Sequence, residues 1–199
     1  GLPTYEGFTL DTTAENFESA IITADGNAVV YIKYTRNSYA LNIYGYTQKV
    51  DGEYEEGTVN GGVVNTNATT YLFEEVVELD AEAKNGFTVT WYTSFDVSTG
   101  VGSGEVTSVT MGAAAANVYV VFARVGYTLN VVAYTQNADG EYEENATGGD
   151  FSATASGAEN KYLHGSVITL TAASSQGFEA AVWYTSFDAS TGVGTDEVT

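Results

Sequence analysis

The sequence predicts a mostly β fold made of tandem, small β-rich repeat modules in an elongated arrangement. Three observations predict it. The chain is rich in Val, Tyr and Thr and contains 22 glycines but one proline, a composition that favours strands and turns. Apolar and polar residues alternate in several segments, and long blocks of sequence recur. With 44% hydrophobic residues among 199, the chain can build a core.

Two sequence blocks occur twice. Residues 41–56 and 129–144 agree at eleven of sixteen positions and start 88 residues apart. Residues 91–102 and 183–194 differ at one position and start 92 residues apart. Such self-similarity at a nearly fixed period is the sequence signature of a repeat protein. The additional residues of the later copy fall between the two blocks, where loops absorb insertions.

The repeats divide the chain into three parts. Residues 1–36 are the C-terminal half of a preceding repeat, 37–124 are a complete repeat, and 125–199 are a repeat that lacks its closing strand. The closing strand of the complete repeat and its earlier copy align as follows: Val118 with Val30, Val120 with Ile32, Phe122 with Tyr34, and Arg124 with Arg36. This alignment assigns the opening segment to the same series.

Each repeat is expected to open with a hairpin. Residues 127–134 alternate apolar with polar side chains at period two, which is typical of a strand with one buried face. Asp51-Gly52 and, in the next copy, Asp139-Gly140 follow the opening segment and can supply the positive φ angles of a tight turn. A strand that enters a hairpin turn is therefore predicted in both copies.

Further strands follow along each repeat. They are predicted at 167–172, at its counterpart 76–81, and at 86–92, and the segment 118–124 closes the complete repeat. The β-branched, small and aromatic residues of these segments suit a pleated, half-buried surface. A short helix is expected over 13–20, where a threonine can cap its first turn.

The charge balance excludes several partners. Six basic residues face 26 acidic ones, which gives a formal net charge of −20, so neither nucleic acid nor an anionic membrane is an expected partner. No stretch approaches the roughly 20 apolar residues of a membrane span, so direct membrane insertion is not expected. The chain has no cysteine and hence no disulfide. The first residues lack the basic and apolar segments of a signal peptide, so the chain is expected to be a piece of a longer protein.

The order of these motifs resembles a known family. A Y-x-L opening and a D-G turn are followed by G-F-x-x-x-W-Y at 86–92 and by N-V-Y-V-V-F-A-R at 117–124. This order resembles the Listeria–Bacteroides repeat family, which is related to the internalin B-repeats and mucin-binding-type repeats of bacterial surface proteins. The resemblance implies a β-grasp-like module in arrays that are extracellular, either on the bacterial cell surface or secreted. The sequence departs from the family in its long units and in its T-S-F-D-[VA]-S-T-G-V-G insertion.

Three functions are compatible with these features. The resemblance implies a non-catalytic stalk or spacer of a bacterial cell-surface protein. The alternative is an adhesin module that binds a host or matrix glycan or protein through the repeated aromatic and acidic loops. The candidate contacts are Tyr92, Phe95 and Asp96 in one loop and Tyr184, Phe187 and Asp188 in the other. A further alternative is a non-catalytic appendage of a secreted enzyme.

No catalytic site is predicted. The one histidine, His164, precedes a glycine in an expected turn and has no histidine counterpart in the earlier repeat, so a hydrolase triad is not supported. The glycines of 100–104 resemble a phosphate-binding loop, but no helix follows them, and they are interpreted as a flexible hairpin loop. Trp91 and Trp183 are expected to anchor the cores of their units.

Calcium is the one cofactor with a sequence argument. Acidic residues cluster beside the two turns, Asp51 and Glu53 in one copy and Asp139 and Glu141 in the next. Carboxylates are the ligands that calcium prefers. The spacing is not that of an EF-hand, and solvated acids beside a turn explain the same residues.

Intramolecular cross-links, which occur in surface stalks, are a further alternative. The lysines that could form an isopeptide bond are Lys33, Lys49, Lys84 and Lys161. Lys49 is replaced by Asn137 in the later copy, which argues against a bond repeated in each unit. Gln48 and Gln136 do recur and leave a Thr–Gln ester link open.

The repeat boundaries also predict self-association. The last repeat lacks the counterpart of its closing strand, so it is expected to expose a strand edge, which is adhesive. The opening segment carries such a strand over 29–36. Residues 1–36 are therefore expected either to pack on the next repeat or to pair with the incomplete repeat of another molecule, head to tail.

Overall fold

The computed structural model describes residues 3–11, 24, 26–27, 29, 31–145, 147–154 and 161–198. All regular secondary structure among them is β-strand, and none of them lies in a helix, so the predicted mostly β class is confirmed. The helix expected over 13–20 lies outside the described residues. In the described part of the chain, no helix is long and apolar enough to cross a membrane.

Two compact units make up the chain, Gly1–Arg124 and Val125–Thr199. The strands of the first unit are β1 (Phe8–Leu10), β2 (Tyr34–Arg36), β3 (Ser38–Gln48), β4 (Tyr54–Glu56), β5 (Gly62–Val64), β6 (Thr70–Leu72), β7 (Val76–Glu78), β8 (Ala81–Ala83), β9 (Phe87–Asp96), β10 (Val101–Glu105), β11 (Ser108–Thr110) and β12 (Ala116–Arg124). Those of the second are β13 (Gly126–Thr128), β14 (Tyr134–Gln136), β15 (Tyr142–Glu144), β16 (Gly149–Thr154), β17 (Lys161–Leu163), β18 (Thr169–Ser174), β19 (Trp183–Asp188) and β20 (Val193–Val198).

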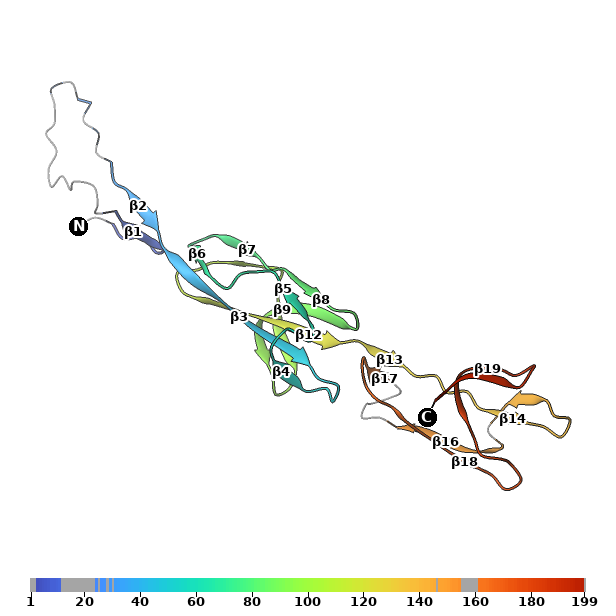
Figure 1. The fold of residues 1–199 in the computed structure, drawn as a ribbon. Helices are drawn as coiled ribbons and strands as arrows, with labels where there is room; N and C mark the ends of the chain where they lie inside the picture. Colours follow the sequence, from blue (N-terminus) through green and yellow to red (C-terminus); the bar gives the residue numbers. More distant parts are fainter. Residues whose placement is uncertain are drawn as a thin grey trace. The chain divides into compact units, whose positions relative to one another are not determined.

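A mixed sheet organises the first unit. Its strands lie in the order β10-β9-β12-β3-β4, and β6 pairs with the start of β3. The closing strand β12 lies in the middle, parallel to β3 and antiparallel to β9 (Figure 1). Val120, for example, is opposite Gly45 on one side and opposite Trp91 on the other. A parallel pair needs a long crossover connection, and here the segment from β4 to β11 supplies it.

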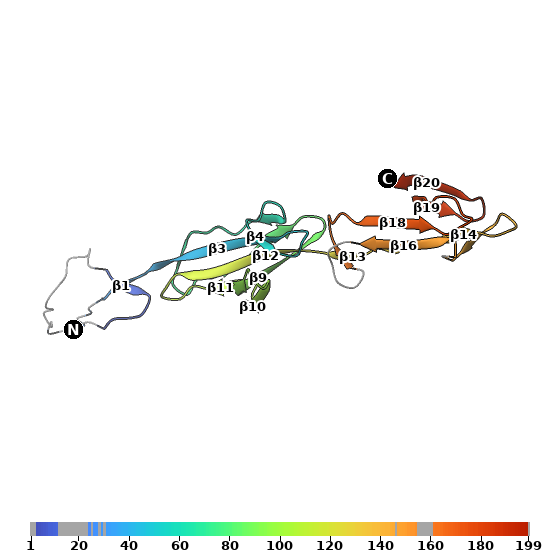
Figure 2. The same cartoon turned by 90° about the horizontal axis from the view of Figure 1, so that it is seen from below.

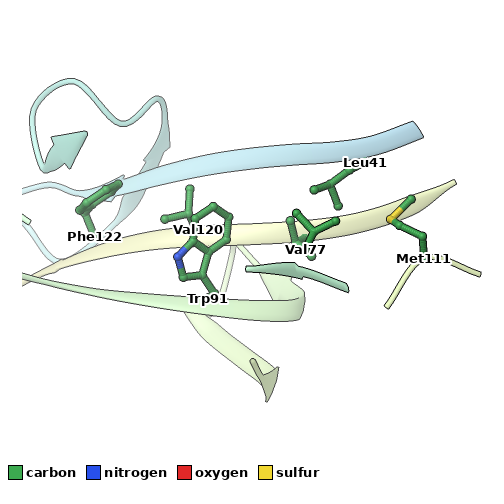
Figure 3. Packing of buried hydrophobic residues seen from close by; sticks show 7 residues of the cluster. Leu41, Val77, Trp91, Met111, Val120 and Phe122 are labelled. Carbon is green, nitrogen blue, oxygen red and sulfur yellow. The ribbon is translucent and has the colours of Figure 1, made fainter. Parts of the chain in front are cut away.

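The core lies on one face of this sheet. Alternate residues of β12, namely Val118, Val120 and Phe122, are fully buried at 0% exposure, as period two requires. Leu41 of β3 and Trp91 of β9 join them at 1% and 6% exposure. Figure 3 shows the cluster extending along β3, β12 and β9 to Val77 and Met111, which are also buried. Partly buried residues of β5, β8 and β11 pack against it.

The N-terminal segment repeats one contact of the main sheet. Phe8 of β1 lies opposite Arg36 of β2, as Phe87 of β9 lies opposite Arg124 of β12. The Phe8 ring also packs edge-on against Phe73, with centroids 5.8 Å apart. The described part of this segment therefore packs against the first complete repeat, which is one of the two arrangements that the sequence predicted for it.

The second unit repeats four strand pairs of the first in the same register. Four strand pairs recur: β13–β17 as β3–β6, β14–β15 as β3–β4, β16–β18 as β5–β8, and β19–β20 as β9–β10. Figure 2 shows β16 beside β18 and β19 beside β20. The predicted turn glycines behave alike, since Gly52 has φ 94° and Gly140 has φ 85°. Local sequence therefore determines the two hairpins, β14–β15 and β19–β20.

The opening segment of the second unit is not one strand, so the prediction of a strand over 127–134 is wrong. β13 ends at Thr128, β14 begins at Tyr134, and residues 129–133 lie in no strand. In the first unit the counterpart of this segment, 41–45, pairs with β12 along its whole length. No strand takes the place of β12 in the described part of the second unit, so the alternating pattern alone does not produce a strand there.

Three other strand predictions need new boundaries. The strand predicted over 167–172 is β18, which begins at Thr169 and runs to Ser174 because it pairs with β16. The segment 76–81 divides between β7 and β8, which pair with β11 and β5 respectively. Of the strand predicted over 29–36, the described residues form only β2, over the part that faces β1.

Candidate functional site

The aromatic residues predicted as ligand contacts lie in a ring cluster that joins two hairpins. Phe95 of the β9–β10 hairpin packs against Tyr46 and Tyr54 of the β3–β4 hairpin, with both centroid distances 5.2 Å. It also stacks with Tyr92 at 6.3 Å. We call these four residues the first aromatic clasp. Because β9 and β3 lie on opposite sides of β12, the hairpin tip crosses β12 to make the contact, and Val121 of β12 is buried at 4% exposure.

The second unit contains the same cluster. Phe187 lies 5.0 Å from Tyr134, 5.1 Å from Tyr142 and 6.3 Å from Tyr184, between ring centroids. The interplanar angles also match, at 41°, 77° and 24° against 40°, 76° and 20° in the first unit. We call this group the second aromatic clasp. Each phenylalanine is partly buried by its own tyrosines, so its first role is to pack the hairpins together.

The glycines of the G-V-G segments have no side chain, and this leaves room for the tyrosine rings of the two aromatic clasps. A Cβ on Gly102 would lie 2.6 Å from the Tyr92 ring, and one on Gly100 would lie 2.7 Å from the Tyr54 ring. Gly194 and Gly192 have the same relation to the second clasp, at 2.4 and 2.7 Å. The prediction of a flexible loop at 100–104 is therefore wrong. Most of this segment is strand β10, whose glycines let rings lie directly on the backbone.

The acidic residues of the predicted site close the two hairpin turns. Oδ1 of Asp96 accepts hydrogen bonds from the Ser98 hydroxyl at 2.6 Å and from the Ser98 backbone N–H at 2.9 Å. Asp188 and Ser190 make the same pair of bonds, at 2.7 and 2.9 Å. Hydrogen bonds to the charged form lower the pKa of both carboxyl groups, and the largest cause is the serine hydroxyl in each case. Each aspartate therefore has a structural use within its own turn.

Removal of the Ser98 hydroxyl should raise the pKa of Asp96. In the wild-type chain the folded pKa lies below the unfolded value of about 3.9, so the carboxylate stabilises the turn above that pH. The stability is lost as the pH falls through the lower folded pKa. We expect Ser98→Ala to move the Asp96 midpoint in an NMR titration towards its ordinary value. Ser190→Ala, as the matched control, should move the Asp188 midpoint and leave Asp96 unchanged; an unmoved Asp96 midpoint in Ser98→Ala would contradict the assignment.

A row of tyrosines lies on the sheet face opposite the core. Tyr119 of β12 is opposite Tyr44 of β3 and opposite Tyr92 of β9. The Tyr44 and Tyr119 rings stack with centroids 5.2 Å apart, and Tyr44 is 40% exposed. Sequence reasoning missed this row because it compared the repeats, and the counterpart of Tyr44 in the later repeat is Val132. The register of β12 between β3 and β9 creates it.

The acidic side chains of the turn at 51–53 form a hydrogen bond and ion pairs within the turn. Oδ1 of Asp51 accepts the Glu53 N–H at 3.0 Å, and Lys49 Nζ lies 3.1 Å from Asp51 Oδ2 and 2.6 Å from Glu53. The backbone bond from Glu53, followed by Lys49, lowers the pKa of Asp51. No cluster of three or more His, Cys, Asp or Glu side chains suited to a metal occurs among the described residues. Nothing in these residues therefore adds to the sequence argument for calcium.

Two further residues considered in the sequence analysis, His164 and Gln48, contact neighbouring residues of the fold. His164 follows β17 in a turn, with its ring 6.3 Å from that of Tyr127. Gln48 donates through Nε2 to the Gly52 carbonyl at 3.1 Å, and its Oε1 accepts the Arg124 N–H at 3.0 Å. These bonds tie the first hairpin turn to the end of β12, which gives Gln48 a role in positioning.

Trp91 and Trp183 differ despite their identical neighbours. Trp91 is buried at 6% exposure in the first core, whereas Trp183 is only partly buried and contacts Phe151, with centroids 6.3 Å apart. Trp91 therefore anchors a core as predicted, and Trp183 does so less completely. Comparison with family models, with curated proteins and with solved structures finds no match to the chain.

Proposed function

We propose that the chain is a non-catalytic repeat region of a bacterial cell-surface protein and acts as a stalk or spacer. The observation that carries the proposal is the recurrence of the same hairpins, in the same register, in two successive units. The recurrence includes side-chain detail, since both aromatic clasps have nearly the same ring distances. Repetition of one module is the way in which proteins build length from a short sequence.

The topology supports a β-grasp-like assignment of the repeat. The first long strand, β3, and the last, β12, are adjacent and parallel, and each has an antiparallel neighbour on its other side. This arrangement fits the fold that the resemblance to the Listeria–Bacteroides repeats implies. That resemblance, which rests on core and turn positions, in turn supports an extracellular location on the bacterial surface.

The charge of the chain also suits an extended spacer. A net charge of −20 on 199 residues produces repulsion between neighbouring units and between neighbouring molecules. Repulsion of this kind favours separation over collapse and keeps a crowded surface layer soluble. Salt would weaken it, because the Debye length falls to about 3 Å at 1 M ionic strength.

Small-angle scattering tests the spacer proposal. A compact chain of this length has a radius of gyration of about 16 Å, and we expect a clearly larger value with a pair-distance distribution skewed towards long distances. Near-ultraviolet circular dichroism on the same sample serves as the control, because it shows that the large radius belongs to a folded chain. A folded chain with a radius near the compact value would refute the spacer.

The tyrosine row favours an adhesin as the second candidate function. Aromatic rings on a sheet face can stack on the flat faces of sugar rings or on protein side chains, and Tyr44, Tyr119 and Tyr92 lie side by side on one face. A glycan and matrix-protein array should then show binding that Tyr44→Ala weakens. The matched control is Val132→Ala at the equivalent position of the second unit. Equal binding by both variants, or no binding by the wild-type chain, would refute the adhesin and leave the spacer as the only candidate function.

A further inference from the structure

The tyrosine row of the first unit has a carboxylate at each end. Glu105 of β10 is opposite Tyr92 of β9, and residues directly opposite each other lie on the same face of a sheet. At the other end Glu56 of β4 is opposite Tyr46 and therefore diagonal to Tyr44. Diagonal neighbours of an antiparallel pair are about 7–8 Å apart, which long side chains can bridge. The three tyrosines therefore lie between two acidic residues on one face.

Neither carboxylate is neutralised within the part of the chain that the structure describes. The side chains of Glu56 and Glu105 are exposed, and the ion pairs of the first unit use other acids, namely Asp11, Asp51 and Glu53. None of the residues that the strand registers place on this face is Lys or Arg. The negative faces of the aromatic rings and the two carboxylates together attract a cation.

Tyr44 has an open ring face on the side of Glu56. The other face of its ring stacks on Tyr119, with centroids 5.2 Å apart and an interplanar angle of 23°. Because β12 and β4 lie on opposite sides of β3, the open face is turned towards β4, and the side chain is 40% exposed. A planar cation that stacks there can reach the Glu56 carboxylate at the same time.

A guanidinium group already stacks on an aromatic ring in the same sheet. Arg124 Cζ lies 4.8 Å from the centroid of the Phe87 ring, and its Nε donates to the Gln48 carbonyl at 2.8 Å. One guanidinium thus combines a ring contact with a hydrogen bond to an oxygen. Lysine suits such a site less well, because its ammonium group is a compact charge without a plane that can stack.

We propose that the tyrosine row binds an extended, arginine-bearing segment of a partner protein. The proposal rests on the adhesin as candidate function and specifies the chemistry of its partner. One guanidinium stacks on the open face of Tyr44 and donates two parallel N–H bonds to Glu56, and a second arginine pairs with Glu105 beside Tyr92. Because β4 and β10 are four strand spacings apart, or about 19 Å, an extended segment reaches both sites with arginines about six residues apart.

An NMR titration of the whole chain with synthetic peptides tests the proposal. The probe is a peptide with blocked ends, whose two arginines stand about six residues apart and are joined by Thr and Val, which favour extended backbone. The control peptide contains citrulline in place of each arginine, because citrulline has the same shape without the charge. We expect the arginine peptide to bind with the largest shift changes at Tyr44 and Glu56, a lysine peptide to bind more weakly, and the citrulline peptide not to bind.

Variants of the chain separate this site from attraction to the net charge. Tyr44→Leu and Glu56→Gln should each weaken binding about two- to fivefold, whereas Tyr44→Phe keeps the ring and should bind like the wild type. Glu144→Gln is the matched control, because Glu144 is opposite Tyr134 in the second unit, where Val132 replaces Tyr44. It removes the same charge and should leave binding unchanged. A dispersed NMR spectrum shows that each variant is folded.

Several results would overturn the proposal. Equal binding of the citrulline peptide would show that charge plays no part, and equal losses in Glu56→Gln and Glu144→Gln would show that net charge alone attracts the peptide. Binding by Tyr44→Leu as tight as by Tyr44→Phe would remove the ring from the site. A chain that binds a glycan but not the arginine peptide would refute this partner and keep the adhesin, whereas an array without any binder would refute both.

Discussion

Replacement of Phe122 by alanine should lower the free energy of unfolding of the first unit by about 3–5 kcal/mol. Phe122 has 0% exposure and belongs to the central strand. Its ring fills the space that Gly61 and Gly62 leave, since a Cβ on either glycine would approach Phe122 to 2.3 or 2.2 Å. The backbone there cannot easily collapse into the cavity, so most of the cost should remain.

Urea unfolding followed by far-ultraviolet circular dichroism measures this loss. Tyr34→Ala is the matched control, because Tyr34 is the sequence counterpart of Phe122 but is only partly buried. It contacts Tyr5, with centroids 5.1 Å apart, and donates to the Pro3 carbonyl, so its loss should affect the N-terminal segment alone. Equal destabilisation by the two variants would show that the core does not centre on β12.

The hairpins were predictable from sequence because their determinants are local. The Asp-Gly turns supply positive φ at Gly52 and Gly140, and the recurring blocks 91–102 and 183–194 fold as hairpins in both units. Gly104 has φ 63°, and its counterpart Asp196 has φ 53°. Aspartate is among the residues that tolerate this region, which explains how one turn geometry persists through the substitution.

The candidate site was predictable only in part. The sequence identified Phe95 and Tyr92 as a repeated aromatic pair, but it could not show that Tyr46 and Tyr54 complete the clasp. Those tyrosines lie some forty residues earlier on another hairpin, and single-sequence patterns carry no such long-range contact. The signal that could have revealed the clasp is the glycine at 102, because a strand glycine often marks a place where an aromatic ring lies on the backbone.

The strand content of the second unit was overpredicted for a related reason. Residues 127–134 and 39–46 have the same alternation, yet only the latter form one strand. The difference is the presence of β12, which pairs with the first unit's segment over seven consecutive positions. Strand propensity largely reflects packing and pairing with neighbours. An alternating apolar and polar pattern therefore forms a strand only where a neighbouring strand is available to pair with it.

The two tryptophans test this dependence within one molecule. Trp91 and Trp183 lie in blocks of nearly identical sequence, but Trp91 faces Val120 of β12 and is buried, whereas Trp183 has no such partner strand among the described residues. Trp91→Ala should therefore cost about 3–5 kcal/mol of the first unit's stability. Trp183→Ala should cost about 1 kcal/mol, which is typical of point substitutions that leave no large buried cavity.

The comparison becomes decisive once the second unit has a central strand. With the sequence 108–124 attached after Thr199, Trp183 acquires the surroundings of Trp91, and the cost of Trp183→Ala should rise to the cost of Trp91→Ala. Denaturant unfolding of the parent chain, Trp91→Ala and Trp183→Ala, each with and without the attached strand, gives both costs. The cost of Trp91→Ala should not change. If Trp183→Ala were already as costly in the 199-residue chain, then β12 would not be what buries the tryptophan, and the hairpins alone would form the core.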